Sequence, residues 1–164
     1  MSEYTIKPLS TVTWDAFARL CEKHNGMGFG QCWCTWFHPR RKDVGLDADV
    51  EAGRPYKEFL VREGRSHAAL VFDGDVAIGW CRIFVDRNHR HEGVAAVAVQ
   101  GALDLIAQAG GGVVEAYPQD TAGKKISASF LYSATRSTFE KAGFGYERPK
   151  GKNHCVMRTT VPPE

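Results

Sequence analysis

The stretch 86-DRNHRHEGVAAVAVQGALDLIAQAGGGVVEAYP-118 decides the fold. Charged and imidazole side chains crowd its start, and Gly93 separates them from a run of Val and Ala. Apolar residues then recur at intervals of three and four, which predicts a helix over residues 93–109 with one apolar stripe. The stripe comprises Val94, Val97, Ala98, Ala102, Leu105, Ile106 and Ala109. Glycines 110–112 end this helix, and residues 113–117 predict a strand.

The start of this helix is predicted to bind an anion. The first N–H groups of a helix lack intrahelical acceptors, and the aligned peptide dipoles add partial positive charge there. Gly93 lets a ligand approach the backbone, and Ala95 and Ala96 keep the first turn open. The side chains that add donors at the rim are Arg87, His89, Arg90 and His91. The alternative is that Gly93 is only a turn and the charged residues form a solvated loop.

The rest of the chain predicts helices and hairpins. Helical spacing indicates helices over residues 13–24, 55–63 and 133–142. Two β-rich runs flank Asp73-Gly74-Asp75, which is a hairpin signal, and residues 144–149 and 154–161 predict a second hairpin. Strands and helices that alternate between two hairpins are typical of a mixed sheet covered by helices.

Composition limits the classes of protein. The 164 residues are 43% hydrophobic and 24% charged, which suits one globular domain. A net charge of +2 with no long basic run argues against nucleic acid, and no segment is apolar enough to span a membrane. Five scattered cysteines without a signal sequence suit free thiols, so we expect a cytoplasmic protein.

Two motifs resemble those of the GNAT acetyltransferases. Residues 90–95, RHEGVA, are similar to the family's Arg/Gln-x-x-Gly-x-Gly/Ala signature, and residues 139–144, FEKAGF, to its aromatic-x-x-x-Gly-Phe signature. A β-run ending at residue 86 precedes the first motif and a small-residue helix follows it, as in the family. The matches cover about residues 68–160.

The resemblance implies an α/β (α+β) fold: a mixed, mostly antiparallel central sheet flanked by helices on both faces. It also implies a single domain over residues 1–164. Residues 1–65 would supply the N-terminal helices and the acceptor-side loop. Residues 66–118 would supply the core hairpin, the pyrophosphate loop with its helix, and a strand, and residues 119–164 the C-terminal helix and hairpin.

The resemblance also implies an activity, the transfer of an acetyl group from acetyl-CoA to a primary amine of a small molecule or protein. Transfer would be direct, in a ternary complex. The pantetheine arm would bond the strand ending at Phe84 and Val85. The diphosphate would lie on the residues Arg90, His91, Glu92, Gly93, Val94, Ala95 and Ala96. Many members of the family are dimers, so the resemblance is compatible with a homodimer of this chain.

The catalytic acid is not where the family implies it. A tyrosine begins the second signature in many members and protonates the leaving thiolate, but this chain has Phe139 there. Tyr132, about two helical turns earlier, is the first candidate for the acid, and Tyr117 the second. Each could instead be a packed aromatic. Glu115, Asp86 or water could serve as the base. The missing tyrosine also motivates an alternative function, a non-catalytic acyl-CoA-binding module.

An aromatic segment, residues 31–41 (QCWCTWFHPRR), is predicted to face the acceptor. Trp33, Trp36 and Phe37 offer flat apolar surface for the wall of a pocket. Cys32, Cys34 and His38 are candidate ligands for a metal. Structural zinc sites usually have two to four residues between paired cysteines, whereas only one separates Cys32 from Cys34. We therefore expect no metal.

Residues 76–87 depart from the family, because two antiparallel strands are expected there and no turn signal separates them. Three explanations compete: one long strand, a sheet that lacks a strand, or residues missing between Gly79 and Phe84. The third is favoured, and it predicts an interruption of the chain.

Overall fold

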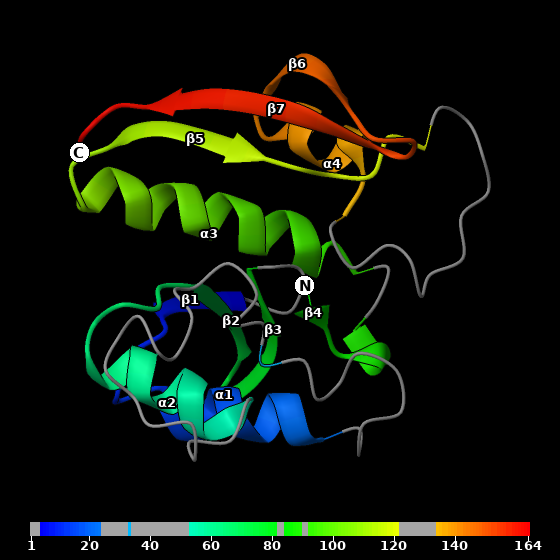
Figure 1. Ribbon diagram of the computed structural model, residues 1–164. Helices are drawn as coiled ribbons and strands as arrows, with labels where there is room; N and C mark the ends of the chain where they lie inside the picture. The colour runs from blue at the N-terminus through cyan, green and yellow to red at the C-terminus, as the bar shows by residue number, and fades with distance from the viewer. Residues whose placement is uncertain (1–3, 24–32, 34–52, 82–83, 90–91, 122–133) are drawn as a thin grey trace.

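The structure is a computed structural model that describes residues 4–23, 33, 53–81, 84–89, 92–121 and 134–164. It contains two antiparallel sheets with helix α3 (Val94–Gln108) between them (Figure 1). The first sheet has the order β1-β2-β3-β4, and its strands are Tyr4–Pro8, Ala69–Asp73, Val76–Trp80 and Phe84–Val85. The second has the order β5-β7-β6, and its strands are Gly112–Ala116, His154–Val161 and Gly145–Lys150.

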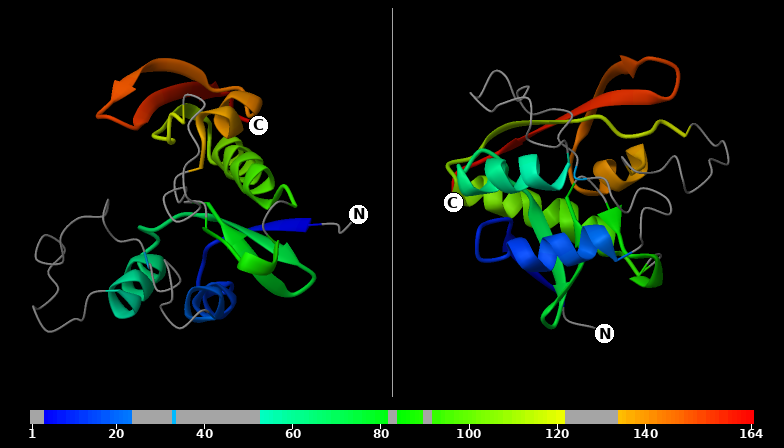
Figure 2. Two further views of the ribbon diagram at one scale, coloured as in Figure 1. Left: turned by 90° about the vertical axis from the view of Figure 1, so that its right-hand side faces the viewer. Right: turned by 60° about the horizontal axis from the view of Figure 1, so that its bottom comes forward.

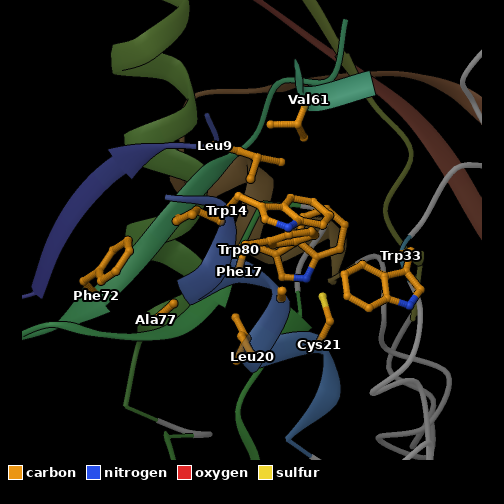
Figure 3. Close-up of a cluster of buried hydrophobic side chains, with 12 residues drawn as sticks. Leu9, Trp14, Phe17, Leu20, Cys21, Trp33, Val61, Phe72, Ala77 and Trp80 are labelled. Atoms are coloured by element: carbon orange, nitrogen blue, oxygen red, sulfur yellow. The ribbon is translucent and has the colours of Figure 1, made fainter. Parts of the chain in front are cut away.

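Helices α1 (Trp14–Glu22) and α2 (Arg54–Arg62) cover the face of the first sheet that is turned away from α3 (Figure 2). Their buried faces meet the sheet in an aromatic core, drawn in Figure 3. A β-bulge helps to build it: Val71 pairs with Gly79 and Phe72 with Ala77, which leaves Ile78 as an extra residue. The bulge lets Ala77 and Trp80 share this core while Ile78 faces α3.

Helix α3 is apolar on two faces. Ala98 packs with Val71 and Ile78 of the first sheet, whereas its neighbour Val99 packs with Cys155 and Met157 of the second. The predicted single stripe is therefore wrong in part. Leu105 and Ile106, which the periodicity placed in this stripe, are only half-buried, because the helix divides its contacts between two sheets.

Gly101 sets how closely α3 approaches β1. A Cβ built on Gly101 would lie 2.7 Å from Cγ1 and Cγ2 of Ile6, far closer than carbon atoms pack. Gly101 is buried in the middle of the helix, where glycine is otherwise unfavourable. Its place is explained by the contact with β1 and not by helix propensity.

The predicted fold class is confirmed: strands and helices mix, the strands pair antiparallel, and helices cover both faces of the first sheet. Within the described residues the expected central sheet is divided into two. Strand β1 was not predicted. Helix α4 (Arg136–Lys141) begins later than residue 133, because Ala134 has a φ of 53° that no right-handed helix accepts.

Residues 76–87 form two strands, so the explanation of one long strand is wrong and no strand is lacking. Gly79 pairs with Val85 and Trp80 with Phe84, antiparallel. Only residues 81–83 separate the paired ends, which is a common length for a hairpin loop. The third explanation, an interruption of the chain between Gly79 and Phe84, concerns residues 82 and 83, which lie outside the described residues, so it stays a prediction.

Replacing Gly101 with Ala should destabilise the fold by about 1–3 kcal/mol, because the added methyl overpacks the contact with Ile6. The measurement is urea unfolding. Ile6→Ala removes the three crowded atoms, so in the double variant the cost of Gly101→Ala should largely disappear. Strictly additive losses would show that the methyl meets a different obstacle.

Candidate functional site

The first turn of α3 presents backbone donors. Gly93, at the N-cap, has a φ of +82°, and a Cβ there would meet nothing within 4 Å. Its carbonyl accepts from Ala96 N at 2.9 Å and from Val97 N at 3.2 Å. The N–H groups of Val94 and Ala95 donate to no acceptor among the described residues. Among the described residues, the amides of Val94 and Ala95 are thus available to a ligand, while the predicted donor Ala96 is already bonded.

The segment that leads into this turn is tied to the first sheet. Tyr4 on β1 pairs across the strands with Asp73 on β2. The hydroxyl of Tyr4 donates to Oε2 of Glu92 at 2.9 Å, and Oδ2 of Asp73 lies 3.9 Å from Nε2 of His89. The edge of the sheet therefore contacts both Glu92 and His89, which flank the signature residues 90 and 91.

Asp86 has a structural role at the end of β4. It is fully buried and forms an ion pair with Lys23 of the segment after α1. Its Oδ1 accepts from Asn88 N at 3.1 Å, which caps the short 3-10 helix η3 (Arg87–His89). A carboxylate held this way is a poor general base, since burial separates it from an incoming amine.

Strands β4 and β5 are both edge strands. Strand β4 pairs with β3, and β5 pairs with β7; neither has a second strand partner within the described residues. Phe84 and Val85, the predicted pantetheine contacts, thus lie on an edge of the first sheet. An edge strand offers backbone N–H and C=O groups to an extended ligand.

Tyr117 and Glu115 belong to a polar network on the second sheet. The hydroxyl of Tyr117 donates to Oε2 of Glu115 at 2.7 Å, and Arg158 donates to Oε1 of Glu115 at 2.6 and 2.9 Å. These bonds, that of Tyr117 first, lower the pKa of Glu115, and the carboxylate in turn raises the pKa of Tyr117. A carboxylate with a lowered pKa is a weak base, so Glu115 is poorly suited to deprotonate an amine.

Phe139, which stands at the family's tyrosine position, packs in the second core. Its ring meets that of Phe144 edge-on at 5.1 Å. Cys155, in the same cluster, is fully buried, and burial raises the pKa of its thiol. Burial likewise raises the pKa of Cys21 to about 12. Neither thiol has the lowered pKa and exposure of a nucleophile.

Trp33 lies in the core and not on an open wall. It is 9% exposed, stacks on Trp14 at 5.9 Å and meets Phe17 edge-on at 5.9 Å (Figure 3). Lys57 of α2, for which the sequence made no prediction, is buried beside this cluster, with Nζ 5.4 Å from the ring centroid of Trp80. Lysine side chains are mostly exposed in folded proteins, so no pattern in the sequence predicts the burial of Lys57.

The remaining predicted site residues lie outside the described residues: Trp36, Phe37, Arg90, His91 and Tyr132, and the cysteines and histidine weighed as metal ligands, Cys32, Cys34 and His38. Among the described residues, no three His, Cys, Asp or Glu side chains are grouped as metal ligands would be. In the same part of the chain, no helix has the length and hydropathy for a membrane span.

A pocket of about 210 Å³ opens between α1 and α2. It is lined by Thr11, Trp14, Glu58, Val61 and Arg62. Glu58 and Arg62 already form an ion pair at 2.6 Å, so its two charged groups satisfy each other. Its lining residues come from α1, from α2 and from the segment before α1.

The fold is similar to that of another protein of known structure. Over 97% of this chain and 99% of the other, the structure is similar to a crystal structure from Desulfovibrio desulfuricans that is assigned to the GNAT family of acetyltransferases, with a TM-score of 0.54. This chain has the GNAT fold. The identity is 14%, so the likeness extends to the fold alone. No family model and no curated protein matches the chain in sequence.

Replacing Tyr117 with Phe should raise the pKa of Glu115, because the hydroxyl is the largest cause of its depression. A lowered native pKa contributes stability above the unfolded-state pKa, and this is lost as the pH falls through the native value. The variant should therefore lose less stability than the wild type on acidification. Carboxyl carbon NMR shifts measure the pKa, with Tyr146→Phe as the control. An unchanged titration of Glu115 would contradict this account.

Proposed function

We propose that this protein is an N-acetyltransferase that moves an acetyl group from acetyl-CoA to a primary amine. Two observations support the proposal. The chain has the GNAT fold, and two amides at the start of α3, which have no acceptor among the described residues, lie within the segment that resembles the family's acetyl-CoA signature. The second observation carries more weight, because one fold can host many functions whereas a binding site is specific chemistry.

The residues at the start of α3 fit a diphosphate. Val94 and Ala95 supply N–H donors at the positive end of the helix, where an anion is favoured. The space beside Gly93 is open, so a phosphate oxygen can approach the backbone. The unpaired edge of β4 suits the pantetheine arm, whose amides can bond an extended strand at Phe84 and Val85.

Two thiols of the described residues, Cys21 and Cys155, suit direct transfer better than a covalent intermediate. The amine nitrogen attacks the thioester carbonyl, the C–N bond forms and the C–S bond breaks, so no protein nucleophile is needed. Cys21 and Cys155 are buried with raised pKa values, which disfavours the thiolate that an acyl-enzyme would require. The acceptor amine must lose a proton, and bulk water can take it, since Asp86 and Glu115 are both ion-paired.

The leaving thiolate takes a proton from a tyrosine in this proposal. Phe139 has no proton to give. Tyr132 is the first candidate for the donor. Tyr117 is the second; its hydroxyl is bonded to Glu115, and its raised pKa keeps it protonated at neutral pH.

A non-catalytic acyl-CoA-binding module is the second candidate. Phe139 favours it, because its ring packs against Phe144 in the core and leaves the family's position for the acid without a hydroxyl. The two candidates share the cofactor site and differ only in turnover.

The deciding experiment combines calorimetry with acetyl-CoA and a transfer assay against a panel of amines. Binding with turnover supports the enzyme, binding without turnover supports the module, and no binding overturns both. In the transfer assay, Tyr132→Phe should lower kcat by about 10²-fold or more and leave acetyl-CoA affinity unchanged, as loss of a general acid does. Unchanged turnover would remove Tyr132 from the mechanism.

Replacing Gly93 with Asn should weaken CoA binding about tenfold or more and leave the unfolding midpoint nearly unchanged. Asn tolerates the left-handed backbone at φ +82°, and its side chain enters the space that a phosphate would use. Gly64→Asn is a matched control, because Gly64 has a φ of +63° with nothing within 4 Å. Equal losses of binding and stability in Gly93→Asn would identify Gly93 as a structural turn.

A further inference from the structure

A hydrogen bond joins β1 to the residue before the N-cap of α3. The hydroxyl of Tyr4 donates to Oε2 of Glu92 at 2.9 Å, although 88 positions separate the two residues. The ring of Tyr4 is half-buried and packs against the cluster that contains Val94 and Ala98. The hydroxyl is therefore held in place by the same core that anchors α3.

Glu92 would otherwise compete for the start of α3. A carboxylate near a helix N-terminus is attracted to the unfilled N–H groups and to the positive end of the dipole. Yet no side chain caps α3, and the carboxylate of Glu92 lies on Tyr4. The amides of Val94 and Ala95 thus have no acceptor among the described residues even though an acidic side chain stands beside Gly93.

We infer that Tyr4 is a positioning residue for the diphosphate: by holding the carboxylate of Glu92 against β1, it keeps that carboxylate from the amides of Val94 and Ala95. This inference rests on the proposed function, which places the diphosphate of acetyl-CoA on those amides. Without the hydroxyl of Tyr4, Glu92 acts as an internal anion that the diphosphate must displace. The side chain of Tyr4 touches no reacting atom and acts through Glu92 alone.

The protonation state of Tyr4 suits this role. The hydrogen bond to Glu92, with burial and the charges of Glu92 and Asp73, raises the pKa of Tyr4. The phenol therefore remains a donor throughout the neutral range and does not add a second negative charge beside the cofactor.

The experiment is a double-mutant cycle on CoA affinity, measured by calorimetry with the full chain. Tyr4→Phe keeps the ring and removes only the hydroxyl, and it should weaken CoA binding about two- to fivefold, the usual range for a carboxylate at a helix N-terminus. Glu92→Gln should bind CoA at least as tightly as the wild type. In the Glu92→Gln background, Tyr4→Phe should change the affinity by less than about twofold.

Kinetics give a second readout. Tyr4→Phe should raise KM for acetyl-CoA and leave kcat unchanged, because only cofactor binding is affected. Tyr146→Phe is the control, since Tyr146 lies on β6 with its ring against Arg136. The control should change neither constant.

Each contrary result has its own meaning. If Tyr4→Phe weakens binding equally with and without Glu92, Tyr4 acts through packing and the inference fails while the proposed function stands. Weaker binding in Glu92→Gln would show that Glu92 assists the cofactor, and would also overturn the inference. If the wild type binds no CoA, the proposed function fails first and the inference fails with it.

Discussion

The packing of α3 between two sheets is the constraint on which the structure depends. In the described residues the two sheets share no strand pairing, so the helix joins them. Its apolar side chains divide between the sheets, Ala98 facing one and Val99 the other. Gly101 brings the helix close to β1, and Gly111, just past its end, lies against the backbone of Val161, where a Cβ would be 2.4 Å from the carbonyl oxygen.

The same packing determines what the helix offers a ligand. Val94 is buried at the first turn, so the backbone of that turn is fixed, and the left-handed Gly93 directs the chain away from it. The described part of the site is thus built from backbone groups whose positions follow from the core, and Glu92 and His89 beside it contact Tyr4 and Asp73. In the second core, Phe139 packs edge-on against Phe144.

Much of this fold could be predicted from the sequence, because periodicity and turn residues report local structure directly. The hairpin at Gly74, the start of α3 at Gly93 and the end of α4 at Gly143 all follow from such signals. Burial decided by distant partners could not be predicted. Lys57 is buried by aromatic rings that lie elsewhere in the sequence, and the hydrogen bond between Tyr4 and Glu92 joins segments that no local pattern relates. The sequence predicted that backbone N–H groups at the start of α3 would be free to bind an anion. It did not predict that the N–H of Ala96 donates to the carbonyl of Gly93.

The division of α3 between two partners has a consequence for how its sequence can vary. Ala98 and Val99 are adjacent but pack against opposite sheets. A shift of the helix that relieves crowding at one of them therefore creates a gap at the other. Tolerance to substitution should therefore be low at these two buried positions, where only side chains of nearly the same volume fit.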